Sequence, residues 1–402
     1  MSKLSVVIVN YNVKHYLRQC LESLRRASAG LDVDVWVADN HSSDGSVAFL
    51  RPLFPEVQWI ECHHNLGFAR GNNLILRQLT SDYVLLLNPD TIVGEQTLKR
   101  AIAFLDAHPD AGAVGMKMLN SDGTRALESR RGVPTPMTSF YKMVGLCKLF
   151  PRHPKFGHYY MSGLPWDEVA PIEIVSGACF LTRKTVLDHV GLLDQAFFMY
   201  GEDIDLAYRI LQAGYTNYYL PFPILHYKGE STQKSSFRYV HVFYKAMLIF
   251  LRKHYRHLRL WITLPIQFAI WSKATLTLVR MKLQSMRKAL GFVPKKAAFD
   301  VEYILVSDER RREMVKHIHR STGIMLSLVE KGSTVEANAP DAVLAGLSKN
   351  AASVCLVYDT ELFAFDEMFD MIEHHNMQRA AIGTFNAESK TIMTQTEVLT
   401  WA

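Results

Sequence analysis

Short apolar runs and helix-like repeats alternate along the first third of the chain. Four runs rich in Val, Ile and Leu are bounded by polar residues, as buried strands usually are: residues 4–10, 33–40, 57–62 and 83–87. Between the first two runs, Leu17, Leu21 and Leu24 recur at helical spacing, and another helix is expected near residues 69–79. This alternation of strands and helices predicts a largely parallel, doubly wound α/β sheet.

The pattern changes further along the chain. Residues 132–170 are rich in Pro, Tyr and Phe without clear periodicity, and we expect loops over a cleft there. Residues 172–183 return to a strand pattern, and residues 201–215 have the pattern of an amphipathic helix. From residue 300 a second alternation of strands and helices begins, which predicts a small Rossmann-like α/β domain without a glycine-rich phosphate loop.

The net charge of +6 is unevenly distributed. Residues 231–299 contain 14 Lys and Arg and no Asp or Glu, so the rest of the chain has 31 basic and 39 acidic residues, a balance of −8. The centre of this segment, residues 260–279, is apolar, with Trp261 and Trp271. An apolar centre between basic flanks favours helices that lie in a membrane face over nucleic-acid binding or a soluble dimer core.

These patterns predict three parts, which are an α/β domain over residues 1–232, a membrane-associating helical segment over 233–299 and a small α/β domain over 300–402. The five cysteines form no CxxC pair, which argues against a zinc knuckle and suits a reducing compartment. The first apolar run ends at Asn10 and is too short for a signal peptide. No GxGxxG follows that strand, so a dinucleotide site is not expected.

Polar and acidic residues follow the predicted strands at their carboxyl ends, where open α/β sheets bind ligands. They are Asn10-Tyr11-Asn12, Asp39-Asn40, Asn88-Pro89-Asp90 and, later, Glu202-Asp203. Carboxylates repel a phosphate-bearing ligand unless a divalent cation lies between them. Mg²⁺ or Mn²⁺, held by one or two carboxylates and by phosphate oxygens, meets that need. The sequence therefore predicts a polar-ligand site that accommodates a divalent metal.

Seven motifs occur in order over residues 4–232: VVIVNYN, VADNHSSDGS, NLGFARGNN, LLLNPDT, SGACFLTRK, FFMYGEDIDLAYRILQAGY and HYKGEST. Together they resemble family 2 glycosyltransferases with the GT-A fold, especially the rhamnosyltransferase-like branch. The resemblance implies a doubly wound mixed sheet that binds a nucleoside-diphosphate sugar. It also implies an inverting transfer that uses a divalent metal, Mg²⁺ or Mn²⁺.

The resemblance assigns roles to individual residues. Asp203 would be the general base, with Glu202 beside it, and Asp90 and His226 would bind the metal. The implied donor-binding residues are Asn10, Tyr11, Asn12, Asp39, Asn65, Gly67, Asn72, Asn88, Lys228 and Ser231. The implied acceptor-binding residues are Trp166, Ser176, Gly177 and Ala178. Asn88 departs from the family pattern, because it is neutral where the DXD motif of this fold has an acid.

Several of these residues also have a purely structural interpretation. Asp39 suits a helix N-cap, and Asn88–Asp90 suit a turn. Glu202 and Asp203 suit the first turn of a helix, where the dipole favours carboxylates. His226 and Trp166 suit ordinary packing. The sequence alone leaves both interpretations open for each of them.

The predicted function is an inverting, metal-dependent glycosyltransferase at the cytoplasmic membrane face. dTDP-rhamnose is the expected donor, a lipid-linked saccharide of a surface polysaccharide is the expected acceptor, and nucleic acid is not an expected partner. A processive polysaccharide synthase is one alternative, but its QxxRW motif is missing, because none of the six Trp follows Arg. An inactive membrane scaffold is another, against which the presence of Asp39, Asp90, Asp203 and His226 argues.

Overall fold

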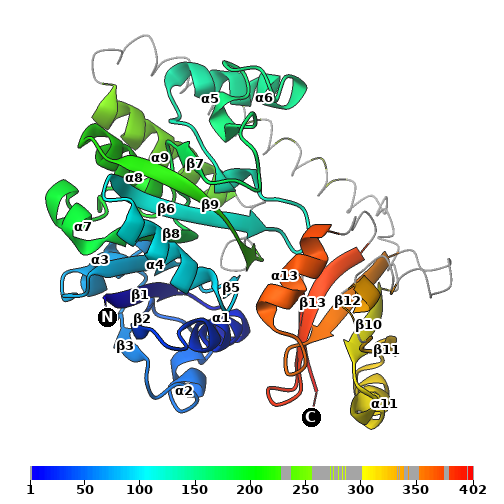
Figure 1. Ribbon diagram of the computed structural model, residues 1–402. Helices are drawn as coiled ribbons and strands as arrows, with labels where there is room; N and C mark the ends of the chain where they lie inside the picture. The colour runs from blue at the N-terminus through cyan, green and yellow to red at the C-terminus, as the bar shows by residue number, and fades with distance from the viewer. Residues whose placement is uncertain are drawn as a thin grey trace.

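Figure 1 shows the computed structural model of the chain. It describes residues 2–227, 237–255, 301–332, 353–374, 380–395 and 397–401, with a few isolated positions between these ranges. Two sheets organise the described residues, and each sheet carries its own helices. Every predicted site residue that the structure describes lies in the larger sheet or beside it.

The larger sheet has nine strands in the order β3-β2-β1-β4-β8-β6-β9-β5, and β7 pairs with β9. The strands are β1 (Lys3–Asn10), β2 (Asp32–Asp39), β3 (Gln58–Glu61), β4 (Tyr83–Leu87), β5 (Thr91–Val93), β6 (Ala111–Leu119), β7 (Ala170–Ile172), β8 (Cys179–Arg183) and β9 (Thr216–His226). β1 to β4 are parallel, as predicted, whereas β8 runs antiparallel to both β4 and β6. The sheet is therefore mixed.

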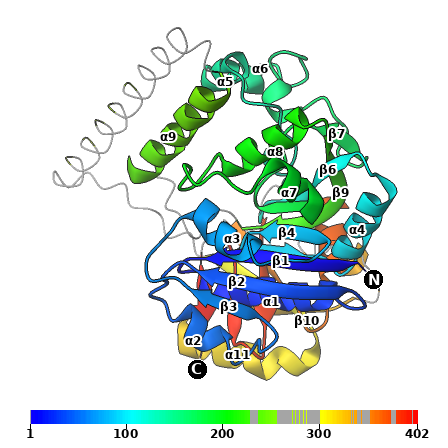
Figure 2. The same cartoon turned by 90° about the vertical axis from the view of Figure 1, so that its left-hand side faces the viewer.

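Helices cover both faces of this sheet because side chains alternate along each strand. On one face, Val6 and Ile8 pack with Leu21 of α1, and on the other face Val7 packs with Ile75 of α3. The helices are α1 (Lys14–Ala27), α2 (Ser46–Leu50), α3 (Phe68–Leu76), α4 (Thr97–Ala107), α7 (Lys184–Val190), α8 (Glu202–Gln212) and α9 (Phe237–His254). Figure 2 shows α3, α8 and α9 on the same side of β1 and β4.

Residues 132–170 contain more helix than we predicted. α5 (Pro136–Met143) and α6 (Leu146–Leu149) lie there, with a 3₁₀ turn at His158–Tyr160. α5 begins in the ordinary way, since the Thr135 side chain accepts a hydrogen bond from Thr138 N and a proline occupies the first turn. The helix was missed because its apolar side chains face outward, so the usual pattern of a core-facing helix is absent.

The second sheet has the order β11-β10-β12-β13-β14-β15. Its strands are β10 (Val301–Ser307), β11 (Leu326–Glu330), β12 (Ser353–Asp359), β13 (Ala380–Asn386), β14 (Thr391–Met393) and β15 (Val398–Thr400), and its helices include α11 (Arg312–Thr322) and α13 (Phe365–His374). The four parallel strands were predicted, but the antiparallel β14 and β15 were not. The boundaries at residues 232 and 299 stay predictions.

The two sheets share a hydrophobic core. One cluster joins Ile92 and Leu225 of the larger sheet to Phe365 and Phe369 of α13. Polar contacts reinforce it, because Tyr16 Oη donates to Thr394 O at 2.8 Å. The second α/β unit is therefore packed directly against β5, which follows Asp90, and against the end of β9, which carries His226.

The predicted membrane segment is only partly described. α9 packs on the larger sheet through Ala246 and Phe250, which are buried. Residues 260–279, the apolar centre of the segment, lie outside the described residues except for a few isolated positions. Among the residues that the structure does describe, there is no helix with the length and hydropathy needed to cross a membrane.

Candidate active site

The carboxyl ends of β1 and β2 meet where the sequence predicted donor binding. Asn10 and Asp39 are register partners on these strands. Asn10 Nδ2 donates to Asp39 Oδ1 at 2.7 Å, and Ser42 N donates to Asp39 Oδ2 at 2.9 Å. Ser42 Oγ in turn accepts a hydrogen bond from Asn12 N at 3.0 Å. Asp39 does not cap α2, whose N-cap is Gly45.

A second loop, residues 65–67, leads into α3 and lies against this edge. Asn40 holds it through two hydrogen bonds, one from Asn40 Nδ2 to Gly67 O at 3.0 Å and one from Leu66 N to Asn40 Oδ1 at 3.2 Å. Gly67 has a φ of +80°, and a Cβ there would lie 2.3 Å from Phe198 O, so only glycine fits. The close approach at Gly67 is thus to the loop before α8.

Other predicted donor residues differ in exposure. Asn65 Oδ1 accepts a hydrogen bond from Gly67 N at 2.9 Å, which shapes the loop. Asn72 is fully buried, and its Nδ2 donates to Phe68 O at 2.9 Å inside α3. Tyr11 is partly exposed and Asn12 exposed at the rim. Lys228 and Ser231 lie outside the described residues.

Asn88, Pro89 and Asp90 form the turn between β4 and β5 and bring Asp90 to His226. Thr91 of β5 is the register partner of His226 at the end of β9. His226 Nε2 lies 3.2 Å from Asp90 Oδ1 and 3.3 Å from Asn88 Nδ2. Asp90 and His226 are 5% and 9% exposed, so both belong to the wall of the site. The turn and ligand interpretations of this stretch are therefore compatible.

These residues fit a divalent cation that is shared with a ligand. A carboxylate oxygen and an imidazole nitrogen face each other at 3.2 Å, and both are ordinary ligands of Mn²⁺ and related ions. Among the described residues there is no group of three or more His, Cys, Asp and Glu side chains placed to hold a metal. The chain itself thus offers two such ligands at this point, and diphosphate oxygens would have to complete the shell.

The first turn of α8 carries the predicted base. Tyr200 and Gly201, which precede it, both have left-handed backbone conformations, with φ of +68° and +89°. A non-glycine residue in that region is strained, and such strain is concentrated at functional sites. Asp203 Oδ2 accepts hydrogen bonds from Arg131 Nη2 at 2.6 Å and from Gly177 N at 3.0 Å. Arg131 therefore holds Asp203 at the predicted acceptor loop.

Glu202 differs sharply from its neighbour. It is 5% exposed, and its Oε2 atom is buried without a hydrogen-bond partner. Burial, together with the charge of Asp203, raises the pKa of Glu202 to about 8. Burial therefore favours the protonated form of Glu202 at neutral pH.

The acceptor loop, residues 176–178, connects the two halves of the site. Asn88 N donates to Ala178 O at 3.0 Å, so the turn with Asp90 lies beside the loop that contacts Asp203. A Cβ added at Gly177 would lie 3.0 Å from Asp203 Cβ, which leaves no room for a larger residue without movement. Ser176 is partly exposed at this point.

Trp166, the other predicted acceptor residue, is already in contact with the protein. The Arg130 guanidinium lies 3.6 Å from the Trp166 ring centroid, and the Tyr219 ring packs edge-on at 6.2 Å. Trp166 O accepts a hydrogen bond from Tyr219 Oη at 2.7 Å. Its packing interpretation is therefore realised, and its acceptor role stays a prediction.

Arg131 is the main residue that the sequence analysis missed. It joins Asp203 across 72 positions of the chain, and no local pattern announces such a pair. Burial, the largest influence, would lower the pKa of Arg131, but Asp203 and other nearby groups outweigh it and raise the pKa. The sequence offers little to single out Arg131, which is one basic residue at the point where the chain pairs with Ile174 beside the sheet.

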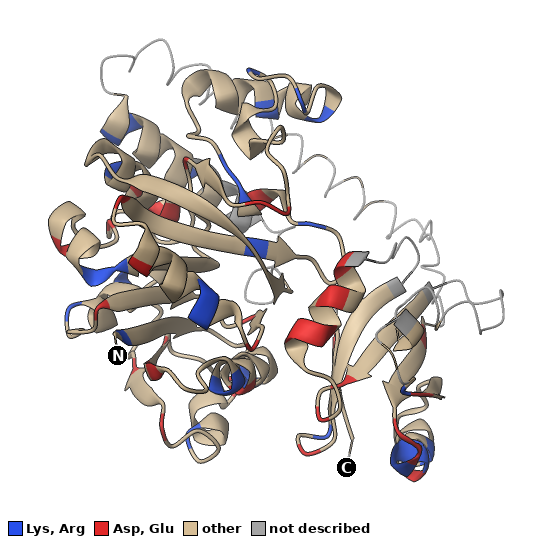
Figure 3. Ribbon diagram, in the orientation of Figure 1, with Lys and Arg blue, Asp and Glu red and all other residues tan. Residues whose placement is uncertain are grey.

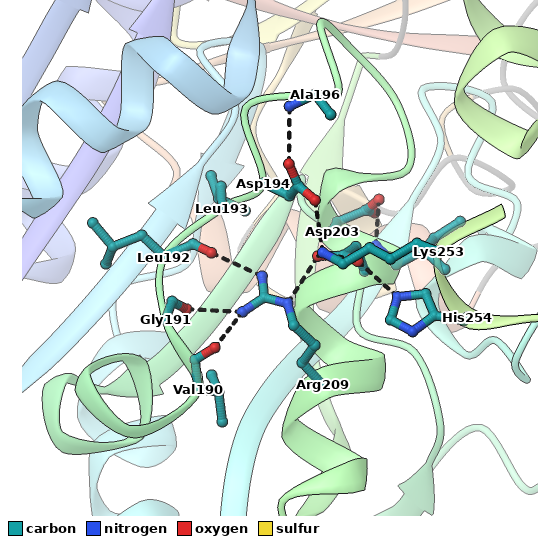
Figure 4. Close-up of polar contacts among 12 residues, drawn as sticks. Val190, Gly191, Leu192, Leu193, Asp194, Ala196, Asp203, Arg209, Lys253 and His254 are labelled. Carbon is teal, nitrogen blue, oxygen red and sulfur yellow. Dashed lines mark hydrogen bonds and ion pairs between the residues drawn. The ribbon is translucent and has the colours of Figure 1, made fainter. Parts of the chain in front are cut away.

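Asp205, two residues after Asp203, belongs to a separate network. It is fully buried, and its carboxylate accepts a hydrogen bond from Arg209 Nε at 2.8 Å and contacts Lys253 Nζ at 2.8 Å and His254 Nε2 at 2.8 Å. Figure 4 shows Arg209, Lys253 and His254 gathered at this point, with Asp194 beside Lys253. This network ties α9 to α8, so Asp205 has a structural role.

Comparison with known proteins identifies the family. The sequence model of Glycosyl transferase family 2 matches residues 5–191. The chain is 30% identical over 298 residues to the N-acetylglucosaminyl-diphospho-decaprenol L-rhamnosyltransferase of Mycobacterium tuberculosis, covering 71% of this chain and 95% of that protein. The chain belongs to glycosyl transferase family 2. This confirms the resemblance read from the seven motifs, including its rhamnosyltransferase-like character.

The chain is also similar, at lower sequence identity, to other glycosyltransferases. The rhamnosyltransferase WbbL of Escherichia coli is 26% identical over 58% of this chain and 91% of its own length. Among solved structures, TarS 1-349 of S. aureus is 20% identical, with a TM-score of 0.42, over 61% of this chain and 64% of that one. The mannosyltransferase PcManGT of Pyrobaculum calidifontis, in complex with GDP-Man and Mn²⁺, is 17% identical over 73% and 81%, with a TM-score of 0.44.

Proposed function

We propose that this glycosyltransferase inverts the configuration of the sugar it transfers, depends on a divalent metal, and moves L-rhamnose from dTDP-rhamnose to a lipid-linked saccharide. We place the reaction at the cytoplasmic face of the membrane, in the synthesis of a cell-envelope glycan. Two relatives named as rhamnosyltransferases support the sugar, and the name of one of them specifies a diphospho-decaprenol acceptor. The donor nucleotide is proposed from the motif resemblance.

One observation carries the proposal. Asp39, the Asp90–His226 pair and Asp203 follow a single edge of the larger sheet, and the hydrogen bond from Asn88 N to Ala178 O joins the two halves of that edge. A donor lying along the edge would extend from the base-binding strand ends to the catalytic carboxylate. The proposed roles then follow one another in the order of the donor's parts, from base to diphosphate to sugar.

Each of these residues has a separate role in the proposed reaction. Asp39 accepts a hydrogen bond from the base, in a geometry that Asn10 and Ser42 already hold. Asp90 and His226 would hold the metal, which when bound neutralises the charge on the leaving diphosphate. Asp203 takes the proton from the acceptor hydroxyl as it attacks the anomeric carbon. Arg131 holds the Asp203 carboxylate in orientation through their contact at 2.6 Å.

The test is a donor and acceptor screen on the purified full chain. Nucleotide sugars that differ in base and in sugar are offered with a prenyl-diphosphate-linked saccharide, and product is followed by mass spectrometry. We expect dTDP-rhamnose to be consumed fastest, EDTA to abolish transfer, and Mg²⁺ or Mn²⁺ to restore it. Full activity in chelator would remove the metal from the mechanism, and preference for another nucleotide sugar would replace the proposed donor.

A further inference from the structure

An apolar surface lies on α5 and α6, outside the site described above. Six of the fifteen exposed large hydrophobic side chains among the described residues fall within residues 137–150. They are Met137, Phe140, Met143, Val144, Leu149 and Phe150, and we call this group the α5–α6 face. Leu149 is 69% exposed and Met137 55%. Scattered apolar residues are normal on a soluble surface, but a cluster of this kind marks an interaction site.

The face is continuous because α5 turns its apolar side to the surface, whereas most helices turn that side to the core. Met137, Phe140 and Val144 occur at the i, i+3, i+7 spacing of one helical stripe, and this stripe faces outward. Thr138, on the inner side, is 8% exposed. In α5, a polar side chain is therefore buried while apolar side chains are exposed.

Ring contacts extend the face from α5 to the chain beyond α6. The ring centroids of Phe140 and Tyr141 lie 6.2 Å apart, those of Tyr141 and Phe156 5.0 Å, and those of Phe156 and Phe150 5.8 Å. Phe140 and Phe150 thus belong to one connected aromatic group. A connected group of this kind holds its exposed side chains in fixed positions.

The chain segment that carries the face has basic residues and no acidic ones. Residues 136–156 contain Lys142, Lys148, Arg152 and Lys155 and no acidic residue. Three of these cations are exposed, whereas Lys142 turns inward over the Tyr159 ring at 3.7 Å. Figure 3 shows Lys and Arg but no Asp or Glu on α5 and α6.

This chemistry selects among possible partners. Aromatic and aliphatic side chains with a basic rim fit the boundary of an anionic bilayer. Protein interfaces are instead depleted of lysine. A symmetric contact between two copies of this chain would bring the same cations together, which costs affinity. The observations therefore favour lipid over a protein partner.

The face is also close to the site along the chain. Arg131, which pairs with Asp203 at 2.6 Å, precedes Met137 by six residues. Six residues span at most about 22 Å when fully extended. A membrane under the α5–α6 face would therefore lie within reach of the catalytic carboxylate.

We propose that the α5–α6 face docks on an anionic lipid surface and so presents the active site to an acceptor held in that surface. The second half of this statement rests on the proposed function, and the first half does not. It differs from the predicted role of residues 233–299, because it assigns a lipid contact to the domain that carries the site.

The first test measures lipid binding alone. The full chain carrying Phe140→Ser and Leu149→Ser is sedimented with vesicles of phosphatidylglycerol and phosphatidylcholine. We expect its partition coefficient to fall by about tenfold, since two apolar side chains leave the lipid. A matched control carries Leu53→Ser and Met325→Ser, which are 39% and 56% exposed elsewhere, and should partition as the unmodified chain does. Equal partition of both variants would overturn the proposal.

The second test measures how much the basic residues beside the face contribute to vesicle binding. Lys148→Glu with Arg152→Glu should weaken binding to anionic vesicles and have little effect with pure phosphatidylcholine, because the attraction is electrostatic. Arg312→Glu with Lys316→Glu, on exposed positions of α11, is the control. The same variants in analytical ultracentrifugation test the rival partner. A loss of self-association in the Phe140→Ser, Leu149→Ser variant would show that the face joins two copies and would overturn lipid docking.

The third test separates docking from catalysis. Transfer is compared on a long-chain lipid-linked acceptor in vesicles and on a short-chain, water-soluble analogue. The Phe140→Ser, Leu149→Ser variant should lose about tenfold on the first and keep its rate on the second. An equal loss on both would place the face in the acceptor site itself and overturn the docking role. If the unmodified chain uses neither acceptor but binds vesicles through this face, the proposed function fails and the docking stands.

Discussion

Two carboxylates in the first turn of α8 are both buried but differ in the partners that surround them. Glu202 and Asp205 are both almost inaccessible, at 5% and 0% exposure. Asp205 is surrounded by three basic side chains from α8 and α9, whereas one Glu202 oxygen is buried without a partner. Figure 4 displays these three basic side chains, Arg209, Lys253 and His254, close together. The two acids therefore have opposite electrostatic environments within one helical turn.

The pKa values express this difference. Burial would raise the pKa of Asp205, but hydrogen bonds from His254, Lys253 and Arg209 outweigh burial and lower the pKa to about 2. In Glu202, burial and the charge of Asp203 act in the same direction and raise the pKa to about 8. A satisfied buried carboxylate stabilises the fold, while an unsatisfied one beside the site marks functional strain. Asp203 lies between them in sequence and in environment.

The largest expected effect tests whether Asp203 belongs with the functional side of this comparison. Asp203→Asn preserves shape but removes the proton acceptor, so transfer should fall by about 10²–10⁴-fold. Donor affinity, measured by calorimetry with metal present, should change little, because in the proposed site Asp39 and Asp90, and not Asp203, hold the nucleotide. Thermal melting checks that the variant is folded.

The matched variant Glu202→Gln decides between the two neighbours. If Asp203→Asn keeps near-normal turnover and Glu202→Gln does not, the base is Glu202 and our assignment is wrong by one residue. If both variants stay active, the first turn of α8 is only a helix start and the proposed mechanism is excluded.

The second prediction concerns the structural side. Asp205→Asn leaves Lys253 and His254 near a neutral group in a buried network, so the free energy of unfolding should fall by about 3–5 kcal/mol. Chemical denaturation measures this loss. Asp188→Asn is the control, since Asp188 is 59% exposed and pairs with Lys184 on the helix surface, and it should cost less than about 1 kcal/mol. A stable Asp205→Asn variant without turnover would move Asp205 to the functional side.

The sequence anticipated one side of this comparison better than the other. β1 to β4 were predictable because apolar runs end in turn-forming residues, and parallel strands bring their carboxyl ends together. That alone placed Asn10, Asp39 and Asp90 at one edge. The pair of Asp205 with Arg209 is also a local pattern, since residues at i,i+4 are neighbours on one helix.

Other parts of the molecule were not predictable from local patterns. The Arg131–Asp203 pair and the contacts of Asp205 with Lys253 and His254 join distant segments, and only tertiary packing creates them. α5 was missed because its apolar residues face outward. The shared core of the two sheets was missed because each strand pattern looks complete by itself. The apolar residues of α13 do not reveal from the sequence that they pack against the larger sheet.

The third prediction uses pH to separate the two acids. Glu202 binds its proton more tightly in the folded chain, so its contribution to stability is fully present below pH 4.5 and is lost as the pH rises through about 8. Asp205 contributes stability above pH 3.8 that is lost as the pH falls through about 2. The two windows do not overlap.

Glu202→Gln should therefore become progressively more stable than the unmodified chain between pH 5 and pH 8, by an amount on the order of 3 kcal/mol. Denaturant midpoints measured across that range give the comparison. A difference that stays constant with pH would mean that Glu202 is ionised in the folded chain, and the contrast with Asp205 would then be lost.

The smallest expected effect concerns Arg131, which gives Asp203 a cation as Arg209 does for Asp205. Arg131→Gln removes the guanidinium that donates to Asp203 Oδ2 at 2.6 Å, so the carboxylate is held by Gly177 N alone and kcat should fall about tenfold through loss of orientation. Arg131→Lys keeps the charge but has a single donor nitrogen, and it should recover part of the rate. KM for the donor should stay unchanged in both variants, because the nucleotide is bound by other residues, whereas a merely structural Arg131 would lower stability without lowering kcat. An unchanged kcat in a folded Arg131→Gln variant would therefore show that Gly177 N alone positions Asp203, and that the pair at 2.6 Å belongs with the structural network.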